Sequence, residues 1–130
     1  MTNKNGLIVD IDINDLTYQI NGAIYEVNNE LGPGFLEKVY ENALLIELHA
    51  RGLKAENQVP VKVEYKDQII GDYFADIVVD DRVILELKVV ESLQNVHTAQ
   101  LLNYLKATHY KFGLLINFTY PKADIRRFVM

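Results

Sequence analysis

The segment from Asp76 to Lys88, D-I-V-V-D-D-R-V-I-L-E-L-K, holds the residue types best suited to chemistry in this chain. In a β-strand, residues two apart share a face, so Glu86 and Lys88 should point the same way. Leu85 and Leu87 then point the other way, into a core. Asp76 falls on the preceding strand, and antiparallel pairing across a short turn can bring its carboxylate beside that of Glu86.

Two carboxylates at the middle of a sheet repel each other and are costly to remove from water. A divalent cation removes that cost, and all-oxygen ligands favour Mg²⁺ or Mn²⁺. A Glu-x-Lys triplet also fits a solvated strand face that carries an ion pair. The apolar flanks of the triplet make that alternative weaker, because a strand this apolar should be covered on both sides.

Two predicted helices carry further polar side chains. Glu37 and Tyr40 are three residues apart and so share a helix face, although the helix dipole alone also favours a glutamate near an N-terminus. His97, Gln100 and Tyr104 share one face of a later helix, at spacings of three and four. These three could bond phosphate or orient a metal-bound carboxylate, or they could form the polar side of an ordinary amphipathic helix.

Other catalytic templates are missing from the sequence. It has no Walker-A motif, no G-x-G-x-x-G after a strand, no H-E-x-x-H and no G-x-S-x-G. The three histidines are too scattered for a zinc site of short spacing, and we expect His49 and His109 on the surface at helix ends. The absence of cysteine excludes disulfides, thiolate metal sites and cysteine nucleophiles.

Apolar periodicity predicts three helices that would position these residues. The first covers residues 14–31, is capped by Asn14 or Asp15, and ends at Gly32-Pro33-Gly34. The second covers about residues 35–49, with Gly52 just past its end. The third is capped by Ser92 and runs to about residue 108, with these side chains toward the core: Val96, Leu101, Leu102 and Leu105.

Strand patterns fill the rest of the chain. We expect strands over residues 59–65, 69–79, 83–90 and 112–118, a possible bulge at Gly71, and an edge strand over residues 125–129. The order is α-α-β-β-β-α-β, with a further strand at the end. This order predicts an α/β fold in which helices flank a mixed sheet of four to five strands, with a crossover helix before the fourth strand.

The bulk properties limit the class of protein. A chain of 130 residues is expected to form one domain, residues 1–130. The first 12 residues lack an apolar core of signal-peptide length, and no stretch approaches the roughly 20 apolar residues that span a bilayer, so we expect no membrane partner and a cytoplasmic location. The net charge of −5 counts against generic nucleic-acid binding, unless metal ions restore positive charge at a site.

Four motifs, in their order along the chain, resemble those of one protein family. Gly34-Phe-Leu-Glu37-Lys-Val-Tyr40 is similar to the signature of the GxxExxY proteins, a group within the PD-(D/E)XK nuclease-like superfamily. The resemblance continues through three more motifs: Asp76 with Glu86-Leu87-Lys88, H-x-x-Q-L-L-N-Y at residues 97–104, and G-L-L-I-N-F at residues 113–118. It covers residues 15–128 and implies a restriction-endonuclease-like core. One departure is Ala75, which stands where the superfamily pattern has proline before the aspartate.

The resemblance assigns roles residue by residue. It implies that Asp76, Glu86 and the backbone carbonyl of Leu87 bind Mg²⁺ or Mn²⁺, and that Lys88 positions water and stabilises charge on phosphate. Glu37 would be a further metal ligand or hold the water. The substrate-binding residues would be Gln100 and Tyr104, which match a Q-x-x-x-Y motif, with His97 and Tyr40 beside them.

The function that these roles predict is metal-dependent hydrolysis of nucleic-acid phosphodiester bonds, with DNA ahead of RNA as the substrate. The competing hypothesis is an inactive nuclease-fold module that binds nucleic acid or a protein partner, which the acidic balance and scattered lysines favour. The apolar faces of the first helix and of the last strand also allow a homodimer.

Overall fold

The computed structural model describes residues 11–130, so the expectation for the N-terminal segment lies outside the described residues. Three helices are present: α1 (Ile13–Leu31), α2 (Glu37–Ala50) and α3 (Asn95–Ala107). Five strands accompany them: β1 (Ala55–Tyr65), β2 (Gln68–Val79), β3 (Val83–Lys88), β4 (Phe112–Asn117) and β5 (Asp124–Val129). Among these helices, none combines the length and hydropathy that crossing a lipid bilayer requires.

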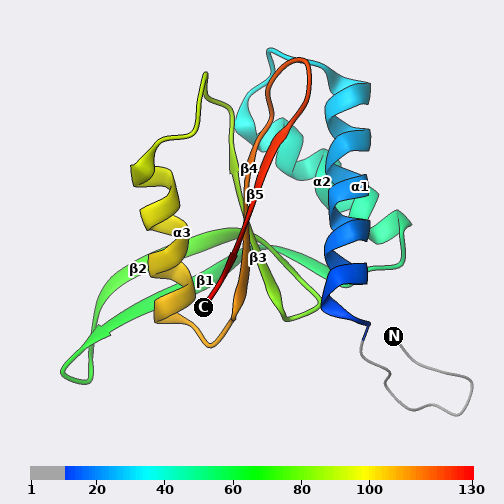
Figure 1. Ribbon diagram of the computed structural model, residues 1–130. Coiled ribbons are helices and arrows are strands. Elements are labelled where there is room, and N and C mark those ends of the chain that lie inside the picture. Colours follow the sequence, from blue (N-terminus) through cyan, green and yellow to red (C-terminus); the bar gives the residue numbers. More distant parts are fainter. Residues whose placement is uncertain (1–10) are drawn as a thin grey trace, which may run out of the picture.

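The five strands form one mixed sheet in the order β1-β2-β3-β4-β5. Only β3 and β4 are parallel, and α3 is the crossover that joins them. Helices α1 and α2 lie on one face of the sheet and α3 lies on the other (Figure 1). This arrangement confirms the predicted α/β fold of restriction-endonuclease type, including the edge strand β5.

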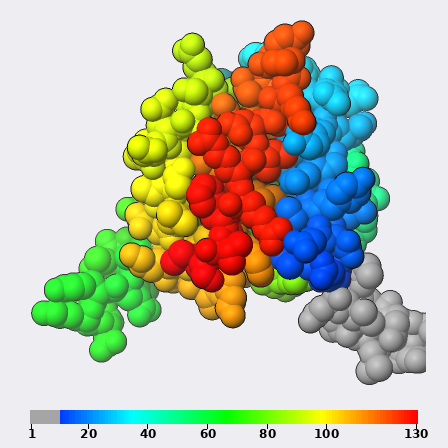
Figure 2. Space-filling view, in the orientation of Figure 1, coloured from blue at the N-terminus to red at the C-terminus, as the bar shows by residue number. Residues whose placement is uncertain are grey.

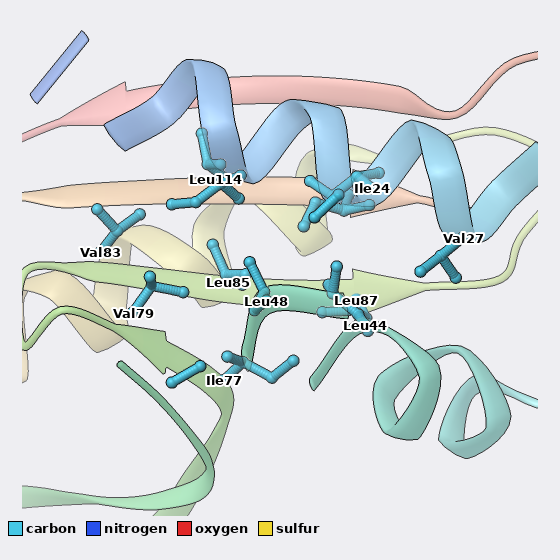
Figure 3. Close-up of a cluster of buried hydrophobic side chains, with 14 of the residues drawn as sticks. Ile24, Val27, Leu44, Leu48, Ile77, Val79, Val83, Leu85, Leu87 and Leu114 are labelled. Atoms are coloured by element: carbon cyan, nitrogen blue, oxygen red, sulfur yellow. The ribbon is translucent and has the colours of Figure 1, made fainter. Parts of the chain in front are cut away.

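Two apolar cores hold the layers together, one on each face of the sheet. The larger packs α1 and α2 against the sheet (Figure 3) and includes Ile24, Leu44, Ile77, Leu85 and Leu114. The smaller lies under α3 and includes Ala75, Val78, Ile84, Leu101 and Leu105. Strand β3 contributes alternate residues to both cores, so it is covered on both faces as its apolar sequence predicted.

The helix ends differ from the sequence prediction in physical detail. Asp12 caps α1 by accepting hydrogen bonds from the backbone of Asn14 and Asp15, so neither of those residues is the cap. Helix α2 begins only at Glu37, because the chain before it stays extended. Helix α3 is capped by Gln94 and not by Ser92, and Val96 in its first turn is exposed, not in the core.

Strands β1 and β2 form a long hairpin whose distal part, residues 60–74, we call the arm. It projects away from the body of the molecule (Figure 2). The predicted bulge is present, since the register shifts between Val63 and Glu64, opposite Gly71 and Ile69. Strand β1 starts at Ala55, four residues before the predicted start, because polar residues there pair with β2.

Candidate active site

The candidate site lies where β2 separates from β3, a point that we call the fork. The two strands pair only as far as Ile77 and Leu85, and the same register places Asp76 opposite Glu86. At that position the two carboxylates take the place of backbone acceptors between the strands. The Asp76 amide donates to Glu86 Oε1 at 3.1 Å, and the Leu87 amide donates to Asp76 Oδ2 at 2.8 Å. The two carboxylates are therefore brought together, as strand alternation predicted.

Strand β1 is also irregular beside Asp76. Its pairs on either side, Asn57 with Ile77 and Val59 with Ala75, keep one register, so Gln58 stands opposite Asp76. The bridge is missing at that position, and Gln58 has a φ of 52°, which is rare for a residue with a side chain. Asp76 thus occupies a break in the sheet on both sides, where its backbone and carboxylate are released from regular pairing.

The fork is an unfavourable place for negative charge. Glu86 is only 3% exposed, and burial, followed by the neighbouring Asp76, raises its pKa to about 8. Burial also raises the pKa of Asp76, while the hydrogen bond from the Leu87 amide opposes that rise. Lys88 lowers both pKa values because its positive charge lies nearby. The charges of Asp76, Glu86 and Lys88 therefore influence one another, and further positive charge nearby would favour the ionised form of both carboxylates.

Lys88 is oriented by α3. Its Nζ donates to Gln100 Oε1 at 3.1 Å, and Gln100 Nε2 donates to the Tyr104 hydroxyl at 3.1 Å. Burial raises the pKa of Tyr104, and the charges of Glu86 and Asp76 add to that rise. The structure therefore brings Gln100 and Tyr104 to the site, as helical spacing predicted.

Glu37 reaches the site from the first turn of α2. Glu37 is exposed to solvent, yet partial burial of its carboxylate raises its pKa, and the negative charge of Asp76 raises that pKa further. Lys88 acts in the opposite direction. Glu37 therefore lies within range of the charges of the fork, but within residues 11–130 it forms no three-acid metal-binding group with Asp76 and Glu86.

Sequence reasoning missed a second glutamate on α2. Glu41, one turn after Glu37, is 4% exposed and accepts hydrogen bonds from Lys38, Asn57 and Gln58. Its spacing of four from Glu37 was the signal that could have revealed it, because both residues lie on one helix face. The two amide donors lie on β1, which no sequence pattern links to α2.

Two residues predicted to bind substrate have other places in the structure. Tyr40 is fully buried, stacks on Phe118 at 4.7 Å between ring centroids, and donates its hydroxyl to the Gly32 carbonyl. His97 Nδ1 accepts the Gln94 amide and so completes the α3 cap. Tyr40 has no surface for a substrate, and the ring nitrogen of His97 that is engaged in the cap is not free to bind one.

The remaining histidines lie at element ends as expected. His49 is exposed, with its Nε2 at 2.8 Å from the Ala55 carbonyl oxygen, and His109 is exposed and stacks on Tyr110. Neither belongs to a metal-binding group, since within residues 11–130 no three His, Cys, Asp or Glu side chains are gathered closely enough to hold an ion together.

The donor set at the fork fits Mg²⁺ or Mn²⁺ in its chemistry. Mg²⁺ is commonly held by one or two carboxylates and completed by water and substrate phosphate, so a preformed cluster of three is not required. Asp76 and Glu86 would supply two hard oxygen ligands, and the charge of a divalent cation would oppose the burial that raises their pKa values.

A groove of about 910 Å³ leads away from the fork, between the arm and α3. Tyr73 from the arm and Tyr104 from α3 approach each other in it, with ring centroids 5.8 Å apart. The charged residues of its lining are Lys106, Glu64 and Lys62, of which Lys62 pairs with Asp72. The groove is linked to the fork through Gln100, which lines it and accepts the hydrogen bond of Lys88.

Comparison with known proteins gives one match. A family model described as the PD-(D/E)XK nuclease superfamily matches residues 14–128, which include every residue of the fork and the groove. A search of curated proteins gave no match, and a search of solved structures gave none either. The family match spans most of the chain and agrees with the mixed sheet, the crossover helix and the paired acids on β2 and β3. The chain therefore belongs to the PD-(D/E)XK nuclease superfamily.

Proposed function

We propose that this protein is a metal-dependent nuclease that hydrolyses phosphodiester bonds in nucleic acid, and that within its superfamily it belongs to the GxxExxY group. The observation that carries the proposal is the reciprocal bonding of Asp76 and Glu86 at the fork, with Lys88 beside them. A structural role alone gives no reason to bury Glu86 next to a second acid, because each charge makes the other more costly.

In this proposal Asp76, Glu86 and the Leu87 carbonyl would hold Mg²⁺ or Mn²⁺. When bound, the cation supplies Lewis-acid polarisation of a phosphoryl oxygen and lowers the pKa of a coordinated water. Glu37, exposed to solvent in the first turn of α2, holds the attacking water and accepts its proton. The water oxygen forms the new bond to phosphorus while the bond to the leaving oxygen of the nucleic acid breaks, and that oxygen takes a proton from solvent.

Lys88 contributes positive charge where negative charge develops on the phosphate. Its hydrogen bond to Gln100 fixes the direction of the ammonium group before substrate arrives, which is how a charged donor becomes effective in a transition state. Tyr104 in turn fixes Gln100. These two residues on α3 therefore act at the junction between the carboxylate pair and the groove.

The groove between the arm and α3 is the proposed path of the nucleic acid. Tyr73 offers an exposed aromatic surface on which a base can stack, and Lys106 offers charge for phosphates. We propose DNA ahead of RNA as the substrate. An inactive module that binds nucleic acid or protein stays the competing hypothesis, and the family match does not favour it. A homodimer through α1 or β5 stays a prediction.

The test is cleavage of labelled single-stranded DNA, duplex DNA and single-stranded RNA with Mg²⁺, with Mn²⁺ and with EDTA. We expect cleavage with either metal and none with EDTA. The double variant Glu86→Ala, Lys88→Ala should lose activity and keep its helical circular dichroism. A matched double variant at exposed positions, Glu30→Ala with Lys111→Ala, should keep activity. Retained metal-dependent cleavage by the Glu86/Lys88 variant would refute the site.

A further inference from the structure

Glu41 is a buried carboxylate that the proposed reaction does not use. It accepts hydrogen bonds from Gln58 Nε2 at 2.8 Å and from Asn57 Nδ2 at 3.5 Å, and it pairs with Lys38. Lys38 is on its own helix, while both amides come from β1. Glu41 therefore ties the first turns of α2 to the irregular position in β1, rather than serving as surface charge.

That irregular position controls Asp76. Gln58 stands opposite Asp76 in the register and has a φ of 52°, in a region that a residue with a Cβ seldom adopts. Such a conformation persists only where the surroundings hold it. The Gln58 side chain is held by Glu41, so the contact with α2 supports the break in β1. The break in turn frees Asp76 from pairing with β1.

One further observation places Glu41 close to Asp76. After burial and the opposing Leu87 hydrogen bond, the charge of Glu41 is the next cause acting on the pKa of Asp76, and it raises that pKa. A carboxylate is also the group that this position needs, because it can accept from two amides and an ammonium at once. A glutamine at position 41 would have to point its own N–H donors toward one of these three donor groups.

We infer that Glu41 is a positioning residue: by holding Gln58 it fixes the break in β1 at which Asp76 turns its carboxylate to the Leu87 amide. The inference rests on the proposed function for its catalytic consequence, while its structural part concerns the hydrogen bond between Asp76 and Leu87 alone. The residue acts through Gln58 and Asp76 and touches no substrate.

Amide hydrogen exchange in the metal-free protein tests the structural part, because the Leu87 amide donates to the Asp76 carboxylate. We expect Leu87 exchange to rise at least about tenfold more than that of β4 amides in Glu41→Ala and in Gln58→Ala, with little further rise in the double variant. Gln58 is exposed, so its variant should fold even if Glu41→Ala does not. Glu47→Ala, on the same helix and paired with Arg51, is the matched control and should leave Leu87 unchanged.

A Leu87 rise no larger than that of the β4 amides would overturn the inference, since it would mean general destabilisation. The catalytic part is tested by Mn²⁺ affinity, which we expect to fall by roughly 10- to 100-fold in both variants, as for other residues that orient metal ligands. Unchanged affinity would overturn that part. A wild-type protein that neither binds Mn²⁺ nor cuts, but shows the expected exchange, would remove the proposed function and support the structural part of the inference.

Discussion

The backbone amide of Asp76 donates to the carboxylate of Glu86 at 3.1 Å, at the point where the two strands stop pairing. The Asp76 carboxylate returns a bond to β3 by accepting the Leu87 amide. Each acid thus satisfies a backbone donor that the broken ladder would leave unpaired. The same exchange fixes the two carboxylates side by side, at a buried position where the ionised form of at least one of them is unfavourable.

The first prediction concerns the pH dependence of stability without metal. Folding raises the pKa of Glu86 from about 4.5 to about 8, so between these pH values the folded protein binds more protons than the unfolded chain. Stability should therefore fall as pH rises through this window, by up to about 1.4 kcal/mol per pH unit. Urea unfolding in EDTA should show this slope, and Glu86→Gln should flatten it. An equal slope in both proteins would contradict the burial of this charge.

The second prediction separates Lys88 from its support. Lys88→Met should lower kcat by roughly 100- to 1000-fold, because it removes a charged donor to the developing phosphate charge. Gln100→Ala should have a smaller effect of the same kind, since it leaves the ammonium in place but frees its direction. Single-turnover kinetics with saturating substrate measures both. A larger loss of kcat for Gln100→Ala than for Lys88→Met would contradict the proposal that Lys88 acts on the phosphate and Gln100 only orients it.

The third prediction tests the groove. Tyr73→Ala removes an exposed aromatic surface from the groove, and base stacking is worth roughly 1–3 kcal/mol per base. We expect weaker binding of single-stranded DNA, seen as a higher KM with little change in kcat. Tyr18→Ala, an exposed tyrosine on α1, is the matched control. Equal KM values for the two variants would show that nucleic acid does not follow the groove.

The fourth prediction concerns Tyr40, whose hydroxyl bonds the Gly32 carbonyl in the turn before α2. Tyr40→Phe keeps the stacking on Phe118 and leaves that carbonyl unpaired, so the free energy of unfolding should fall by about 1 kcal/mol. Thermal unfolding measures the change. Affinity for DNA should not depend directly on the Tyr40 hydroxyl, because the side chain is fully buried. A variant of full stability with weakened DNA binding would restore the substrate role that the motif suggested.

The sequence predicted the part of the site that depends on local periodicity. Alternation along β3 placed Glu86 and Lys88 together, and the short turn after β2 brought Asp76 opposite them. Helical spacing likewise brought Gln100 and Tyr104 to one face. These relationships follow from geometry within one element or across one tight turn, which is why they can be read without an alignment.

The rest depends on contacts that the sequence does not encode locally. The sequence did not connect Glu41 to its amide partners, because these lie 16 and 17 residues away on β1. The φ of Gln58 follows from that tertiary contact and from no turn motif. The capping role of His97 was not predicted, because its ring accepts a hydrogen bond from the Gln94 amide, whereas the cap was expected two residues earlier at Ser92.

The account depends most on the claim that Asp76 and Glu86 together hold a divalent cation. Calorimetric titration of the metal-free protein with Mn²⁺ at about pH 7.5, roughly one unit above the ordinary histidine pKa, tests this directly. We predict saturable binding by wild type and by Glu30→Gln, with at least about 100-fold weaker binding by Glu86→Gln. Equal binding by wild type and Glu86→Gln, or no binding by a folded wild-type protein, would contradict the account.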